Sequence, residues 1–260
     1  MDRIRSRRAG LVLAAGLGAL ALGGCQSGSG TAAPGSTASS ASPSGASGAS
    51  ASASPGLSVP GTHRTTTAYQ VAARVATVVV ISHVGDVTVT GGGSATSVVQ
   101  EADYSKTAPA TTRTLSGTTL TLTYSCATQL VCGVAYVVRV PRDVIVQASA
   151  GAGSVQLSGL AGKVTAQAKA GVISASGLTG SAVSLTTDVG AINAAFTSPP
   201  DTLRAIARVG AITLTVPGGV SYQVTADAHV GKATVSVPQS TSAGHAISAA
   251  TDVGAIRIGT

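Results

Sequence analysis

Apolar residues recur at alternate positions around a series of glycines in the C-terminal half of the chain. Successive glycines of this series are separated by 18, 19, 20, 21 and 23 residues. Such a regular spacing is typical of proteins built from stacked structural repeats. The glycines concerned are Gly153, Gly171, Gly190, Gly210, Gly231 and Gly254.

The alternation within each repeat has a period of two, which places side chains on one face of a β-strand. Only Val, Leu, Ile or Ala occurs at the seventh, fifth and first positions before the glycine and at the second and fourth positions after it. We expect all of these side chains to point inward, including the one directly before the glycine. Each repeat then consists of two half-buried strands, and the glycine forms the corner between them.

A single repeat cannot bury its apolar face, whereas stacked repeats bury a continuous one, with neighbouring strands about 4.8 Å apart. The pattern therefore predicts an all-β fold, a parallel β-solenoid of about six to seven rungs. Gly85 has the same surroundings, with Val84 among the positions expected to point inward, and it predicts a first rung. The inner positions before the corners are mostly Ala, which predicts a thin interior without a buried pocket.

The segment between Gly85 and Gly153 is longer than one repeat, and we interpret residues 94–140 or so as an insertion. It contains strand-like runs at Ser97–Tyr104, Thr118–Tyr124 and Val134–Val140. We expect them to form antiparallel strands that cap the solenoid near its N-terminal end. The last rung ends at Thr260, and we expect its open edge to pair with another copy or another protein.

The N-terminus carries the features of an export signal. Four arginines precede an apolar run from Ala9 to Leu22, which is too short for a permanent membrane span. The run ends in Leu22-Gly23-Gly24-Cys25, which resembles the lipobox of bacterial lipoproteins. We therefore predict a lipoprotein signal peptide over residues 1–24 and a lipidated Cys25 that anchors the chain to the membrane. An ordinary signal peptide with an incidental cysteine is the alternative.

Residues 26–60 are almost entirely Ser, Ala, Gly, Thr and Pro and contain no charged side chain. This composition predicts a disordered tether over residues 25–62, followed by a solenoid domain over residues 63–260. Such an arrangement places the folded domain outside the cytoplasm, at the cell surface and close to the membrane.

The formal net charge of +7 falls to +4 once the predicted signal peptide is removed. The remaining basic residues are scattered, and the whole chain contains one Phe, five Tyr and no Trp. Neither a basic stripe that follows phosphates nor an aromatic platform for bases is present, which argues against nucleic acid as a partner. Weak attraction to anionic envelope polymers is compatible with the remaining charge.

Charged residues recur two positions before the corner glycines. Opposite charges on neighbouring strands stabilise a sheet, so we interpret this column as a solvated ladder that fixes the strand register. A ligand-binding stripe centred on Arg208 and His229 is the alternative. The members of the column are Lys169, Asp188, Arg208, His229 and Asp252.

Cys126 and Cys132 lie six positions apart within the insertion. In an exported protein, two cysteines between strands most often form a disulfide that closes a loop. A metal site is the alternative, but the pair lacks CxxC spacing and a nearby histidine. No metal or cofactor motif occurs elsewhere, so we expect neither.

Two carboxylates provide the main argument for an enzyme. In the predicted register Asp227 and Asp252 lie diagonally on adjacent rungs, and paired carboxylates cleave glycosidic bonds in many hydrolases. A sugar-binding groove also uses aromatic platforms, which this chain has almost no residues to supply. A carbohydrate-active enzyme is therefore the alternative to a non-enzymatic function.

Three groups of motifs together resemble the bacterial putative-adhesin family of β-strand-repeat domains. They are the Val-Gly-Ala-Ile steps at Val189, Val209 and Val253, the Val138-Arg139-Val140-Pro141 segment, and Gly85-Asp86-Val87-Thr88-Val89. The resemblance extends from about Val71 to Thr260. It implies a surface-exposed, non-enzymatic repeat domain without catalytic residues. We expect envelope polymers, glycans or surface proteins as its partners. A structural role in the envelope is the third interpretation.

Overall fold

The structure, a computed structural model, describes residues 62–260. Over these residues the chain forms 19 strands and no helix. The predicted signal peptide, Cys25 and the tether as far as residue 61 lie outside the described residues.

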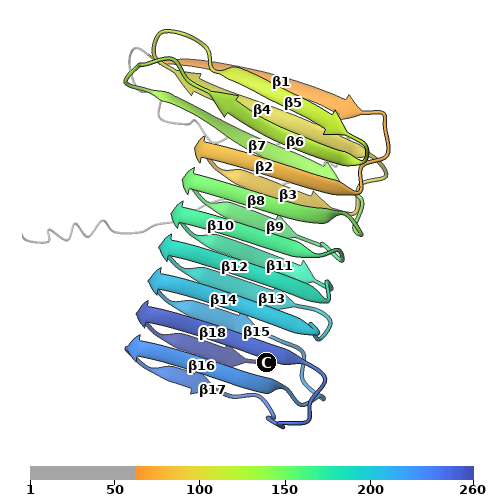
Figure 1. Cartoon of the computed structure of the whole chain (residues 1–260), viewed down its shortest axis with the longest axis vertical. Helices are drawn as coiled ribbons and strands as arrows, with labels where there is room; N and C mark the ends of the chain where they lie inside the picture. Colours follow the sequence, from red (N-terminus) through yellow and green to blue (C-terminus); the bar gives the residue numbers. More distant parts are fainter. Residues whose placement is uncertain (1–61) are drawn as a thin grey trace, which may run out of the picture. The chain divides into compact units, whose positions relative to one another are not determined.

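The strands form two open sheets, and the chain passes from one to the other at almost every turn (Figure 1). In spatial order the nine-stranded sheet contains β16 (Gln223–Val230), β18 (Ala246–Val253), β14 (Thr202–Val209), β12 (Ala182–Val189), β10 (Val164–Ala170), β8 (Ile145–Ala152), β2 (Thr77–Val84), β6 (Thr119–Ser125) and β5 (Ala110–Ser116). The ten-stranded sheet contains β1 (His63–Val71), β4 (Thr96–Tyr104), β7 (Cys132–Val140), β3 (Val87–Gly91), β9 (Val155–Ser158), β11 (Ile173–Leu178), β13 (Ile192–Phe196), β15 (Ile212–Thr215), β19 (Ile256–Gly259) and β17 (Ala233–Val235).

The inner faces of both sheets carry the apolar columns read from the sequence. Along β12, for example, Val183 and Leu185 are buried while the residues between them are only partly so. Equivalent positions of neighbouring repeats pair in register, as Ala166 does with Leu185 and Leu185 with Ala205. The predicted all-β class and the parallel pairing of the repeats are thus confirmed for the described residues.

The order of the last two repeats differs from their order in the sequence. Strand β18 lies between β14 and β16, and β19 lies between β15 and β17. The expectation that the final strands form the open edge is therefore wrong. The edge at this end consists of β16 and β17, whose inward residues Val224, Ala226 and Val235 remain only partly buried.

The opposite end contains the insertion, and only part of it pairs as expected. Strand β4 is antiparallel to β1 and β7, and β5 is antiparallel to β6. However, β6 and β7 pair in parallel with β2 and β3, so they continue the stack of repeats. The prediction that the runs at Thr118–Tyr124 and Val134–Val140 form antiparallel strands is thus only half correct, because each run has one parallel and one antiparallel neighbour.

The edge strands β1 and β5 close the N-terminal end with polar and aromatic groups. The guanidinium carbon of Arg113 on β5 lies 4.3 Å from the ring centre of Tyr69 on β1. The Tyr69 hydroxyl accepts a hydrogen bond of 3.0 Å from Gln100 Nε2. This cation–π contact connects the edges of the two sheets and covers the apolar interior behind them.

Two tyrosines fill the core beneath this end. The Tyr124 hydroxyl donates to the carbonyl of Val84 at 2.9 Å and accepts from its N–H at 2.6 Å. Tyr136 is fully buried, and its hydroxyl has no hydrogen-bond partner. Burial, followed by the proximity of Tyr69 and Tyr124, raises the pKa of Tyr136 well above its usual value.

Candidate functional site

The corner glycines lie in a row along one side of the two sheets, at the carboxyl ends of β2, β8, β10, β12, β14, β18 and β16 (Figure 1). All seven have positive φ, between 126° and 155°. Each of them links a strand of the nine-stranded sheet to the next strand of the ten-stranded sheet. They are Gly85, Gly153, Gly171, Gly190, Gly210, Gly231 and Gly254.

The residue directly before each corner glycine does not point inward, which corrects the sequence interpretation. Val84, Val189 and Val230 are exposed by 50%, 56% and 56%. The period of two places these residues on the inner side of their strands, but the chain is already turning there and the interior has ended. The sequence pattern identified which residues form this column but did not reveal that they are exposed. Alternation along a strand shows which face a side chain occupies and carries no information about where the core ends.

The charged column lies on the outer side of the same strand ends. Its spatial order is Lys169, Asp188, Arg208, Asp252 and His229, because β18 lies between β14 and β16. Signs therefore alternate more regularly in space than along the sequence. Asp188 Oδ1 lies 3.4 Å from Arg208 Nε, an exposed ion pair that contributes at most about 1 kcal/mol.

The structure does not place Arg208 and His229, the centre of the alternative ligand-binding stripe, side by side. Their strands β14 and β16 are not neighbours, and Asp252 on β18 stands between them. Asp227 and Asp252, by contrast, are diagonal neighbours, because Asp227 pairs with Ala250 on β18. Both carboxylates are exposed on an open sheet face.

A disulfide joins Cys126 and Cys132, whose Cα atoms are 6.2 Å apart. The loop that it closes connects β6 to β7 and so takes the place that a single glycine has in the other repeats. Gln129 in this loop accepts hydrogen bonds from the N–H groups of Lys106 and Thr107 and donates to the Thr107 carbonyl. The disulfide therefore lies in a structured corner.

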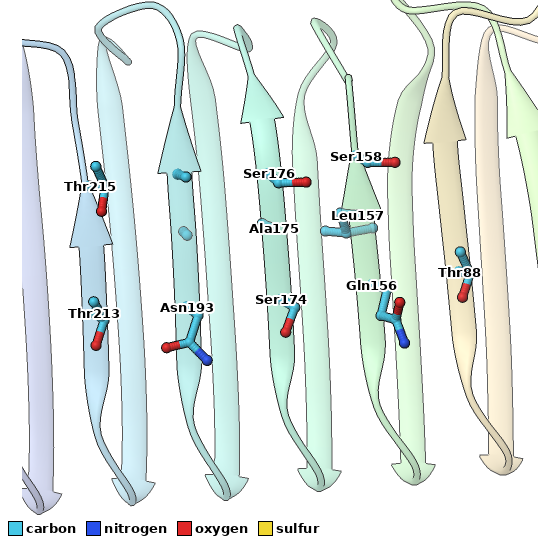
Figure 2. Close-up of a pocket in the computed structure, with 12 residues that line it drawn as sticks. Thr88, Gln156, Leu157, Ser158, Ser174, Ala175, Ser176, Asn193, Thr213 and Thr215 are labelled. Carbon is cyan, nitrogen blue, oxygen red and sulfur yellow. The ribbon is translucent and has the colours of Figure 1, made fainter. Parts of the chain in front are cut away.

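A shallow groove of about 270 Å³ runs across the outer face of the ten-stranded sheet (Figure 2). Small hydroxyl and amide side chains line it in two columns, one position on each successive strand. The first column is Thr88, Gln156, Ser174, Asn193 and Thr213, and the second includes Ser158, Ser176 and Thr215. Across neighbouring strands Thr88 is paired with Gln156, Gln156 with Ser174, and Asn193 with Thr213.

This groove was not singled out by the sequence, where its outward columns appear merely mixed. Its eight polar residues share hydrogen-bonding capacity and five of them are exposed, while Leu157, Ala175, Ala194 and Ala195 supply the apolar floor between the columns. Such a surface offers donors and acceptors at a spacing of about 4.8 Å, without a charged or aromatic centre. It can contact an extended polar partner, and no His, Cys or charged side chain lines it.

Among residues 62–260, no three His, Cys, Asp or Glu side chains gather in a group able to hold a metal ion. The same residues contain no helix that is long and apolar enough to cross a membrane.

The fold and these surfaces define an all-β protein of stacked, mostly parallel strands. No family model matches the chain, and no curated protein matches it. Among solved structures it is similar to a "putative cell adhesion protein" from Clostridium sporogenes, at 13% identity and a TM-score of 0.43, covering 76% of this chain and 99% of that one. A "putative adhesin" from Bacteroides fragilis is similar at 13% identity and a TM-score of 0.35, covering 75% and 97%. One from Parabacteroides merdae is similar at 10% identity and a TM-score of 0.26, covering 76% and 96%.

Proposed function

We propose that this chain is a membrane-anchored extracytoplasmic lipoprotein whose stacked repeats form an open parallel β-solenoid for adhesion or cell-envelope interaction, without catalysis. The observation that carries the proposal is the broad polar face of the ten-stranded sheet. Thr88, Gln156 and Ser174 begin a column that continues in register across the repeats. An extended polymer rich in hydroxyl groups has matching donors and acceptors along its length.

The anchor belongs to the same proposal and is supported by the sequence. A charged segment, a short apolar run and Leu22-Gly23-Gly24-Cys25 occur in the order of a lipoprotein signal. The Ser- and Gly-rich residues that follow would serve as a flexible tether. In this arrangement the repeats stand outside the membrane and within reach of envelope polymers, glycans or surface proteins.

A Cys25→Ala variant tests both parts of the proposal. Without an acyl acceptor it should appear in the soluble fraction, whereas the unaltered chain should sediment with membranes. The released protein should then bind intact cells, isolated cell wall or a glycan array in a saturable manner. Membrane retention of the variant would contradict the anchor, and absence of binding to all three would contradict the adhesive role.

One observation favours a second candidate, a carbohydrate-active enzyme that uses Asp227 and Asp252. The pairing of β16 with β18 places these two carboxylates as diagonal neighbours on adjacent strands, a spacing of about 7–8 Å between Cα atoms. If they act as an acid–base pair, the purified chain should cleave an envelope glycan, and Asp227→Asn should abolish the cleavage. Intact glycans throughout the panel would remove this candidate, and binding without cleavage would favour the first.

A structural role in the envelope uses the same exposed surfaces. It would be favoured if deletion of the gene altered envelope integrity while the protein bound no cell, wall or glycan.

A further inference from the structure

Apolar side chains line the row of corners on both sides of the glycines. We call this row over β10, β12, β14, β18 and β16 the corner strip. Before the glycines it contains Ala170, Val189, Val209, Val253 and Val230, and after them Val172, Ala191, Ala211 and Ala255, with Lys232 after the glycine of β16. Val209 and Val253 are each exposed by 47%, and Val189 by 56%.

The corner strip is where exposed apolar residues concentrate in the described part of the chain. Nine large hydrophobic residues are exposed among the described residues, and five of them directly precede a corner glycine: Val189, Val209, Val230 and Val253 in the strip, and Val84 on β2 outside it. All five occupy the same position of the repeat. Isolated exposed valines need no explanation, but the four on the neighbouring strands β12, β14, β18 and β16 form a continuous row, which is typical of an interaction surface.

The charged column runs beside the strip and limits what can cover it. From β10 to β18 it reads Lys169, Asp188, Arg208, Asp252, so that the signs are plus, minus, plus, minus. Read from the opposite end, this sequence is minus, plus, minus, plus. A second copy rotated by a two-fold axis between β12 and β14 therefore presents the opposite sign at every position.

The pairing follows directly from the equal strand spacing in the two copies. Lys169 would face Asp252 of the second copy, and Asp188 would face Arg208 of the second copy. Val189 would meet Val209 of the second copy in the strip beside them. At the next position outward, Gly151 would face His229, so no like charges meet there. A two-fold axis parallel to the row would instead place the two charged columns on opposite sides of the contact, where their charges could not pair.

We propose that the corner strip is a contact surface for a second copy of this chain, in antiparallel orientation about a two-fold axis between β12 and β14. The strip from β10 to β16 spans roughly 20 Å, which is much less surface than a stable dimer buries. The contact is therefore weak in dilute solution and becomes populated where copies are concentrated. It is independent of the adhesive role, since it concerns a different face of the repeats.

Charge reversal on one side of the axis tests the pairing in the full chain carrying Cys25→Ser, which cannot be acylated. In a dimer of Asp188→Lys, the new positive charge at position 188 of each copy would face the positive Arg208 of the other copy. In a dimer of Arg208→Asp, the new negative charge at position 208 of each copy would face Asp188 of the other copy. Each variant alone should have a dimer dissociation constant about tenfold higher than that of the Cys25→Ser chain with its charges unaltered, as measured by sedimentation equilibrium up to about 1 mM.

The decisive measurement uses an equal mixture of the two variants. One copy then reads plus, plus, plus, minus and the other plus, minus, minus, minus, so every facing pair in the heterodimer is opposite in sign. The mixture should recover the dimer level of the unaltered column. Loss of the internal Asp188–Arg208 ion pair cannot produce this recovery, because each single variant lacks that pair and still lacks it in the mixture. Thermal unfolding of each variant checks that it folds.

Cross-linking checks the geometry independently in the same Cys25→Ser chain. Val189→Cys mixed with Val209→Cys should be joined by a short bis-maleimide several-fold faster than Thr213→Cys mixed with itself, since Thr213 lies on the other sheet's outer face. A monomer at all concentrations, no recovery in the mixture, or equal cross-linking at Thr213 would overturn the proposal. Cross-linking of the strip to a different protein instead of a second copy would overturn it as well.

Discussion

Replacing Gly190 with alanine should destabilise the stacked repeats by about 4 kcal/mol, mostly through backbone overlap. Gly190 has φ of 142°, a region that residues with a Cβ rarely adopt. A Cβ at this position would also overlap the carbonyl oxygen of Gly171 on the neighbouring repeat. Because that oxygen belongs to the backbone of a packed corner, neither group can move away cheaply. Urea unfolding of the full chain measures the loss.

Two other glycines separate the contributions of strain and overlap. Gly177 has φ of 60°, but a Cβ there would have its nearest neighbour at 3.8 Å, so Gly177→Ala should cost only about 1–2 kcal/mol. At Gly244 a Cβ would meet nothing within 4 Å, and Gly244→Ala should change stability by less than about 0.5 kcal/mol. Equal effects at Gly190 and Gly177 would show that overlap between corners contributes nothing.

The corners could be predicted because glycine is the residue type that this geometry demands. Once Gly190 and its equivalents are aligned, the period of two assigns Val183 and Leu185 to the interior, and both are buried. The same rule fails for Val189, since it continues a strand pattern into a turn where no interior remains. Local periodicity therefore predicts which residues share a face but not how far that face is covered.

The strand order could not be predicted from spacing alone, although the residues carry traces of it. The repeat of Gly231 has Ala233 where the others have Val or Ile, and its inward residues are small. The repeat of Gly254 has Ile247, Ile256 and Ile258, which are typical of an interior position. An edge repeat buries less, so the weaker repeat belongs outside. Placing Asp252 beside Arg208 also improves the alternation of charge.

The groove on the ten-stranded sheet depends on a feature that one strand cannot reveal. Gln156, Ser174 and Asn193 belong to three different repeats and form a column only when those repeats pair in register. Read one repeat at a time, they are ordinary outward residues. A candidate surface of this kind is a property of the stack, whereas the disulfide between Cys126 and Cys132 follows from local proximity alone.

Deleting residues 246–260 should unfold β16 and β17 as well as removing β18 and β19. In the structure β16 pairs only with β18, and β17 only with β19, so the deletion leaves both edge strands without a neighbour. Hydrogen exchange of the full chain and the deletion variant should show that amides from Gln223 to Val235 lose nearly all protection.

The result distinguishes the observed strand order from an order that follows the sequence. If β16 paired with β14, the deletion would remove only the final repeat, and β14 would continue to protect the amides of β16 from exchange. A shorter deletion of Gly259 and Thr260 alone serves as the control, because it leaves β18 and most of β19 in place. Unchanged protection between Gln223 and Val235 in the longer deletion would show that β18 is not what holds β16. Loss of protection in both deletions would point to the extreme terminus instead. Loss in the longer deletion alone is expected, because the weakly buried Val224 and Ala226 cannot keep an edge strand folded without a partner.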